Sequence, residues 1–167
     1  MIRVVEIGDP LLKKKSQNVT KFDSNLKSLI SSMIDYGKSV SNCIGLAGCQ
    51  AGKLMRISVI NIDGDWEEII NPKILYKSGD MSTEWEGCMS LKDGNLFGKV
   101  KRSRSVIVEY YDEYGKRQVV KYEGLFSHLI QHEIDHMDGF VFLDRMKDPK
   151  NLLTDHEIEA LIGNDKR

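Results

Sequence analysis

The chain has 167 residues, of which 41% are hydrophobic and 29% are charged, and its formal net charge is -1. These values are typical of one soluble globular domain. The small net charge gives no reason to expect a membrane or a specific nucleic-acid partner, and no apolar run approaches the roughly 18 residues that cross a bilayer. The odd number of cysteines argues against a disulfide framework. Because the N-terminus resembles no targeting segment, we expect a cytoplasmic protein.

Two helices are predicted near the N-terminus. Asp9 followed by Pro10 is typical of a helix cap with proline at the first helical position, so a short helix is expected directly after it. A longer helix is expected after Asp23, because apolar residues recur at three- and four-residue spacing over 26–34. Gly37 is expected to end this helix.

The middle of the chain is predicted to form strands. Five segments have the alternation, or the β-branched and aromatic content, that is typical of strands. They are residues 57–62, 66–70, 73–76, 105–111 and 118–122. Asn71-Pro72 is expected to close the second of these strands, and the turn at 113–116 is expected to join the last two as a hairpin.

The last third of the chain is predicted to contain one long helix. An apolar stripe runs from 124 to about 137, and Asp138-Gly139 is a suitable stop. In the charged segment beyond Arg145, Thr154 and Glu157 form a capping-box pattern that predicts a short helix near 155–162. The order of elements predicts an α+β fold, with small antiparallel or mixed sheets around the central helix and a helix near the N-terminus.

The central helix carries a pattern that indicates metal chemistry. His132 and His136 are four residues apart, so they project from the same face and can bind one divalent ion. Glu133 points to a neighbouring sector, from which it can reach water near that ion without being a ligand. The alternative is a solvated helix face that carries His and Glu by chance. The H-E-x-x-H pattern favours a metal site used for hydrolysis.

A third ligand is needed, and the residues alone leave it open. A catalytic site of this kind takes three protein ligands and keeps one position for water. His128 has the right spacing, but a third histidine on the same helix would bring the backbone too close to the metal. The other candidates are His156, the acids and the cysteines. Cys88 follows Gly87 and is either a thiolate ligand or a small buried hydrophobic residue.

The segment 43–50 is rich in small residues. It suits a loop or a helix start at which backbone amides approach a ligand. It also suits a tight turn packed against the core, and taken alone this second interpretation is favoured.

Three segments, taken together in their order, resemble the signature motifs of the peptide deformylase family. Residues 43–50 resemble G-x-G-L-A-A-x-Q, residues 86–90 resemble E-G-C-L-S, and residues 131–136 match Q-H-E-x-D-H. Flanking residues near positions 8–10 and 138–145 are also similar, so the resemblance spans about 1–147. It implies a catalytic domain over 1–147 and a charged C-terminal tail over 148–167 with a possible short helix.

The resemblance implies a role for each residue of the site. The metal ligands would be Cys88, His132 and His136. Glu133 would be the general acid/base, and Gln50 and the backbone N–H of Met89 would stabilise the oxyanion. The ion would be one divalent metal, Fe(II) natively, with Zn(II), Ni(II) or Co(II) able to replace it.

The resemblance also implies a substrate. Ile44, Gly45, Leu46 and Gly87 would bind an extended peptide in the manner of strand addition. The reaction would remove the N-formyl group from the N-terminal methionine of newly made proteins in the bacterial cytoplasm and release formate. The partners would be N-formyl-methionyl peptides or nascent chains and, through them, the ribosome.

The chain departs from the family pattern at three places. Cys43 replaces the first glycine of the first motif, where a side chain would narrow the cleft or place a second thiol near it. Gly48 replaces the second alanine. Many members carry an arginine shortly after the cysteine motif, whereas the first arginine after that motif in this chain is Arg102.

Two other functions are compatible with parts of the sequence. A zinc peptidase would take a third ligand downstream of the helix, and His156, Glu157 and Glu159 are available there. A non-enzymatic relative would bind formylated peptides without cleaving them, but the presence of Glu133 argues against it.

Overall fold

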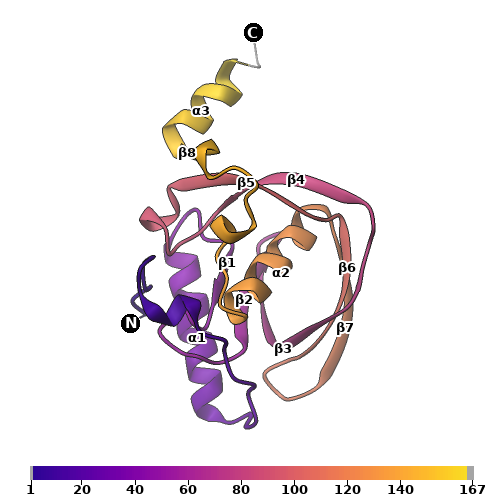
Figure 1. Ribbon diagram of the computed structural model, residues 1–167. Coiled ribbons are helices and arrows are strands. Elements are labelled where there is room, and N and C mark those ends of the chain that lie inside the picture. The colour runs from indigo at the N-terminus through magenta and orange to yellow at the C-terminus, as the bar shows by residue number, and fades with distance from the viewer. Residues whose placement is uncertain (1, 165–167) are drawn as a thin grey trace.

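The computed structural model describes residues 2–164 of the chain. Within these residues, helix α2 (Gly124–Met137) lies in the middle of the body with strands around it, and helix α1 (Ser24–Ser39) lies at the edge of the body, beyond β1 (Gly45–Ala47) and β2 (Ile57–Ile62) (Figure 1). The fold is α+β, as predicted. No helix of the described part is long and apolar enough to cross a membrane.

The larger sheet has five strands in the order β1-β2-β3-β6-β7, and all neighbours are antiparallel. The strands are β1 (Gly45–Ala47), β2 (Ile57–Ile62), β3 (Asp65–Lys77), β6 (Ser105–Tyr111) and β7 (Arg117–Glu123). Alternate residues of β6, such as Val106 and Val108, are buried against Leu129, Ile130 and Ile134 of α2. Every second residue of the strand therefore packs against the apolar face of the helix.

The smaller sheet has three antiparallel strands in the order β4-β5-β8. They are β4 (Met81–Gly87), β5 (Leu96–Ser103) and β8 (Leu152–Thr154). Helix α3 (Asp155–Asn164) follows β8 and projects away from the body (Figure 1). Short 3-10 helices complete the described chain at Pro10–Lys13, Lys92–Gly94, Phe142–Arg145 and Pro149–Asn151.

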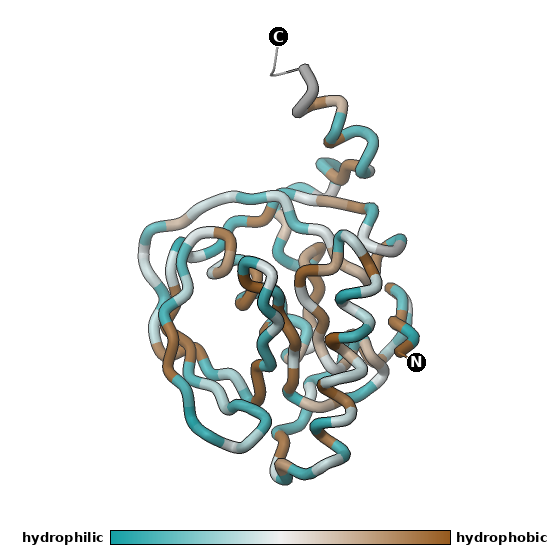
Figure 2. Tube along the Cα trace, turned by 180° about the vertical axis from the view of Figure 1, so that it is seen from behind, coloured by the Kyte–Doolittle hydropathy of each residue, from teal (hydrophilic) through white to brown (hydrophobic). Residues whose placement is uncertain are grey.

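The first long helix follows its prediction, except at its end. The Asp23 side chain caps α1 by accepting from the backbone N–H groups of Asn25 and Leu26, and apolar and polar residues alternate along the helix (Figure 2). The prediction that Gly37 ends the helix is wrong, because α1 continues to Ser39. A Cβ atom at Gly37 would collide with the Trp66 ring, so this glycine serves close packing.

The prediction of a strand end at Asn71-Pro72 is also wrong. Strand β3 runs through both residues, with a register shift at this point, and changes its partner from β2 to β6. Asn71 has a φ of 52°, and its side chain exchanges two hydrogen bonds with the backbone of Val19, at 2.8 and 2.9 Å. A bulge, which tolerates proline, therefore replaces the expected stop.

Three strands near the site were not predicted. β4 and β5 carry glycine and several charged residues, which are depleted in strands. Pairing compensates for this composition: Lys99 lies opposite Trp85, and its Nζ atom is 5.0 Å from the indole centroid. The short β1 lies in the segment 43–50, for which a loop, a helix start or a turn was expected.

Candidate active site

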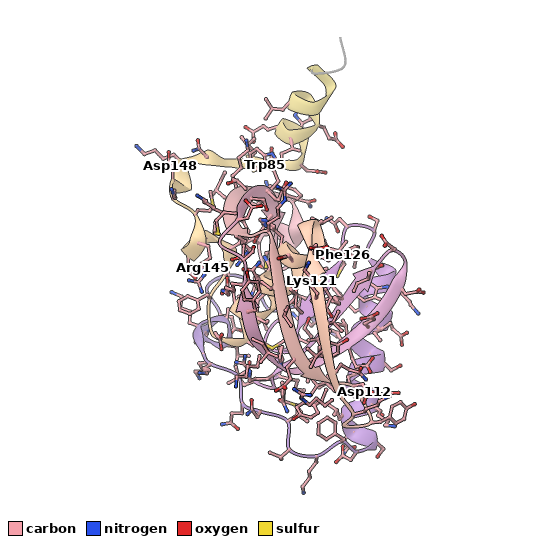
Figure 3. The ribbon with its side chains drawn as sticks, turned by 90° about the vertical axis from the view of Figure 1, so that its right-hand side faces the viewer. Trp85, Asp112, Lys121, Phe126, Arg145 and Asp148 are labelled. Atoms are coloured by element: carbon pink, nitrogen blue, oxygen red, sulfur yellow. The ribbon has the colours of Figure 1, made fainter. Side chains whose placement is uncertain are left out.

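A cavity of about 170 Å³ opens where β1, β4 and α2 meet. Trp85 is on its rim, at the end of the body from which α3 projects (Figure 3). Most of the predicted site residues line it, namely Ile44, Gly45, Gln50, Gly87, Cys88, Met89, His132 and Glu133. Two predicted site residues do not line the cavity: Leu46 is fully buried in the core behind β1, and His136 is buried beside Cys88.

The structure brings Cys88, His132 and His136 together. Their ligand atoms lie within 4.8 Å of one another, and the Cys88 Sγ atom is 3.2 Å from His136 Nε2. Tetrahedral zinc sites have metal–nitrogen distances of about 2.1 Å and metal–sulfur distances of about 2.3 Å, so neighbouring ligand atoms are separated by roughly 3.3–3.8 Å. The grouping of the three atoms and the donor set of one thiol and two imidazoles are those that can hold one divalent ion.

His132 and His136 sit in different electrostatic surroundings. Burial alone would lower the pKa of His132, but its hydrogen bonds with Cys88 and Glu86 outweigh burial and raise that pKa well above the usual value. Burial, together with the positive charges of His132 and Arg102, lowers the pKa of His136 well below the usual value. The neutral imidazole of His136 is the form that binds metal.

Glu133 is buried beside the ligands. Its Oε2 atom accepts a hydrogen bond of 3.4 Å from the Ser58 hydroxyl, and burial raises its pKa to about 7. A carboxyl group with a pKa near neutrality can both accept and donate a proton at working pH. A Cβ atom at Gly45 would collide with this carboxylate, so the glycine of β1 makes room for Glu133.

Gln50 is held so that its amide nitrogen faces the ligand group. Its Oε1 atom accepts from the backbone N–H of Ala47 at 2.8 Å. This bond leaves Nε2 to donate toward Cys88 Sγ at 3.4 Å and Ser90 Oγ at 3.2 Å. The donor is thus fixed in orientation at the wall of the cavity.

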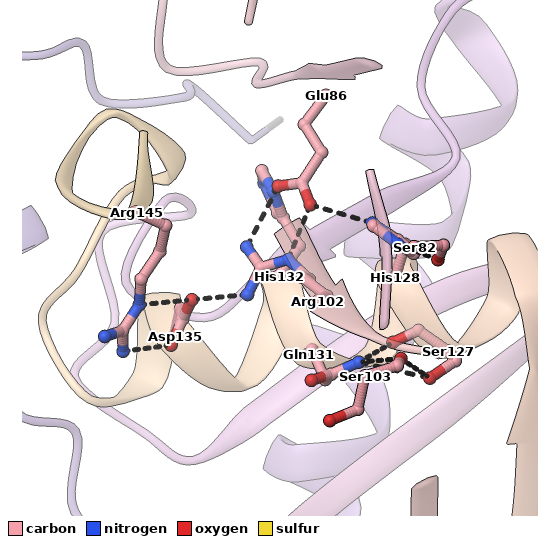
Figure 4. Close-up of polar contacts among 10 residues, drawn as sticks. All are labelled: Ser82, Glu86, Arg102, Ser103, Ser127, His128, Gln131, His132, Asp135 and Arg145. Atoms are coloured by element: carbon pink, nitrogen blue, oxygen red, sulfur yellow. Dashed lines mark hydrogen bonds and ion pairs between the residues drawn. The ribbon is translucent and has the colours of Figure 1, made fainter. Parts of the chain in front are cut away.

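A buried ion-pair network that no pattern in the sequence indicates lies behind Cys88, His132 and His136 (Figure 4). The Arg102 guanidinium binds both oxygens of Glu86, at 2.5 and 2.9 Å, and also binds Asp135 at 2.7 Å. Asp135 in turn pairs with Arg145. Burial would raise the pKa of Glu86, but its bonds to Arg102, His128 and His132 hold it well below the usual range. Arg102 therefore holds Glu86 and Asp135 in place behind the helix and does not line the cavity.

The residues that depart from the family pattern are explained by packing. Cys43 is 4% exposed and faces the core rather than the cavity, and burial raises its pKa to about 12. At Gly48, a Cβ atom would lie 2.8 Å from the carbonyl oxygen of Met55 and 3.0 Å from that of Lys53. The backbone here leaves no room for the alanine found elsewhere.

Together, the fold and the site define a class of protein: an α+β protein in which a cysteine and the two histidines of an H-E-x-x-H motif form a group that could hold one metal ion. The family model for polypeptide deformylase matches residues 1–152. The peptide deformylase of Treponema pallidum is 36% identical over 144 residues, which cover 86% of this chain and 87% of that protein.

Solved structures agree with this match. The peptide deformylase of Thermotoga maritima superposes with a TM-score of 0.84 at 34% identity, covering 89% of this chain and 99% of that one. The enzyme of Synechococcus elongatus, solved in complex with actinonin, superposes with a TM-score of 0.85 at 33% identity. The superposition covers 90% of this chain and 81% of that one. The chain belongs to the polypeptide deformylase family. It is a metal-dependent hydrolase that removes the N-formyl group from newly made peptides.

Proposed function

We propose that Cys88, His132 and His136 hold the catalytic ion and leave one position for water. The observation that carries this proposal is the grouping of the three ligand atoms within 4.8 Å of one another, beside the buried Glu133. When bound, such an ion lowers the pKa of water toward neutrality and makes it a nucleophile. One thiolate and two imidazoles form a soft site, which suits Fe(II) as the native ion and Zn(II), Ni(II) or Co(II) as replacements.

Glu133 is the general acid/base of the proposed reaction. Its carboxylate accepts a proton from the attacking water and delivers it to the amine that leaves when the formyl carbon–nitrogen bond breaks. The pKa of about 7 suits both steps. Formate and a free N-terminal amine are the products.

Negative charge develops on the formyl oxygen during attack, and two donors are proposed to stabilise it. The Nε2 atom of Gln50 points toward Cys88 from a side chain that is only 1% exposed. The backbone N–H of Met89, the residue after the cysteine ligand, is the second donor. Fixed donors in a site that excludes water stabilise such charge strongly.

The substrate backbone is proposed to lie between two strand edges. β1 is the edge strand of the larger sheet and β4 is the edge strand of the smaller one. The Ile44 carbonyl accepts from Asn61 N–H on the β2 side, so the backbone groups of the next residue, Gly45, point to the free edge. Gly45 and Gly87 thus offer backbone for strand addition, and the half-exposed Ile44 side chain stands at the mouth of the cavity. By the same alternation the backbone groups of Leu46 face β2, so Leu46, whose side chain is buried, is proposed to support the β1 edge without contacting the substrate.

The proposed setting is the bacterial cytoplasm, where the enzyme meets nascent chains at the ribosome. The relatives named above include bacterial enzymes. All proposed site residues fall within 1–147, the proposed catalytic domain. The proposed tail over 148–167 adds β8 to the smaller sheet and then leaves the body as α3.

Two variants test these assignments. Glu133→Ala is expected to keep one metal ion per chain and to lose formate release from a formyl-methionyl peptide, whereas Cys88→Ala is expected to lose the ion. The exposed Leu161→Ala, in α3, serves as a control that keeps both properties. Turnover by Glu133→Ala at the wild-type rate, or unchanged metal content in Cys88→Ala, would contradict the assignment.

The sequence left a zinc peptidase as an alternative function for the same helix, and membership of the deformylase family argues against it. It would bind the ion through His156, Glu157 or Glu159, but the metal-ligating group found in the described part of the chain contains none of them. A peptide without a formyl group is the discriminating substrate. The proposal expects no cleavage of its internal bonds.

A further inference from the structure

His128 lies one turn before His132 on α2, and the function proposed above gives it no role. It is 2% exposed and borders the cavity. Its Nε2 atom is 2.8 Å from the Ser82 hydroxyl, and its Nδ1 atom is 3.3 Å from Glu86 Oε1 (Figure 4). Both nitrogens are therefore engaged away from the proposed ion.

The direction of these hydrogen bonds follows from their partners. Arg102 pairs with both oxygens of Glu86, which keeps the carboxylate charged, and a carboxylate only accepts. His128 must therefore carry its proton on Nδ1 and donate it to Glu86. In the neutral ring, Nε2 then carries no proton and accepts a hydrogen bond from the Ser82 hydroxyl.

The same carboxylate holds the metal ligand His132. Glu86 Oε2 accepts from His132 Nδ1 at 2.9 Å, so the His132 proton stays on Nδ1 and Nε2 is left for the ion. Glu86 thus receives hydrogen bonds from Arg102, His128 and His132, and its position is fixed from three sides. If the His128 bond is lost, only Arg102 remains to orient the carboxylate against His132.

We propose that His128, oriented by Ser82, is a positioning residue for the metal site and acts through Glu86 on the tautomer and orientation of His132. This inference rests on the proposed ligand set. His128, whose spacing made it a candidate ligand, is thus proposed to support the ligand His132 instead. Partners of a metal-bound histidine change metal affinity by about 10–100-fold when they are removed. Because His128 acts one bond further out, we expect a loss of roughly three- to tenfold.

The experiment measures the Zn(II) affinity of the metal-free full chain by competition with a chelator. His128→Leu removes the donor to Glu86 and should weaken Zn(II) binding, whereas His128→Asn keeps an N–H near the Nδ1 position and should recover most of the affinity. Ser127→Ala is the matched control. It removes a buried bond of 2.8 Å from α2 to the Ser103 carbonyl but does not touch Glu86, so it should bind as the wild type does.

Each outcome decides the proposal. Wild-type affinity in His128→Leu, or equal losses in the Leu, Asn and Ser127→Ala variants, would overturn it. Failure of the wild type itself to bind Zn(II) would instead overturn the ligand set. An NMR measurement of ring-nitrogen protonation in the wild-type zinc protein is independent of whether any variant folds. The proposal requires the Nδ1–H tautomer at His128, and the Nε2–H tautomer would refute it.

Discussion

Replacing Glu133 by glutamine should stabilise the metal-free protein while abolishing turnover. Burial raises the pKa of this carboxyl from 4.5 to about 7. Between these values the unfolded chain loses the Glu133 proton and the folded chain keeps it, so this group lowers stability progressively as pH rises through the window. At 1.36 kcal/mol per pH unit, the full cost reaches about 3 kcal/mol above pH 7. Glutamine stays neutral and can still accept from Ser58, so it avoids this cost.

The assay is urea denaturation of metal-free wild type and Glu133→Gln at about pH 5 and about pH 8. The variant should gain up to about 3 kcal/mol relative to wild type at the higher pH, and most of that gain should vanish at the lower one. In the metal-loaded enzyme, its turnover should fall by about 10²–10⁴-fold. A stability difference that is independent of pH would refute the reasoning, because it would show that the Glu133 carboxyl is not a buried group of raised pKa.

Three further predictions follow from packing and charge. Arg102→Met should cost about 3–5 kcal/mol in thermal or urea denaturation, because it leaves buried carboxylates without their shared cation. A fully stable variant would contradict that role. Gly48→Ala, which restores the family residue, should lower stability by about 1–3 kcal/mol, since the added Cβ meets two backbone carbonyls. Deleting residues 148–167 should leave metal content and deformylase turnover in place, and loss of the ion would favour the peptidase alternative.

The central helix and its chemistry could be predicted because their signals are local. The apolar stripe of α2 and the H-E-x-x-H pattern lie within fourteen residues, and both match the structure. β2 has the predicted bounds, and the hairpin of β6 and β7 was also expected, because its strands are rich in β-branched and aromatic residues. Cys88, far from the helix in sequence, could be assigned only through the family motifs.

The support of the site could not be predicted, because it depends on strand pairing. Glu86 contacts Arg102, His128 and His132 only because β4 pairs with β5 and α2 packs behind these strands. The charged residues and glycine of β4 and β5 hide their strand character. The sequence around Arg102 therefore does not indicate that it pairs with Glu86 and Asp135. The placement of Cys43 in the core had no local signal either, since a small thiol suits a cleft or a core equally.

The most direct test of the proposed site is a metal titration of the metal-free enzyme, followed by formate release from a formyl-methionyl peptide. It should be done anaerobically with Fe(II) and in parallel with Zn(II). The account predicts that activity rises linearly and stops at one ion per chain, and that Cys88→Ala shows no such endpoint. Formate release without added metal, or an endpoint that is the same in Cys88→Ala, would contradict it.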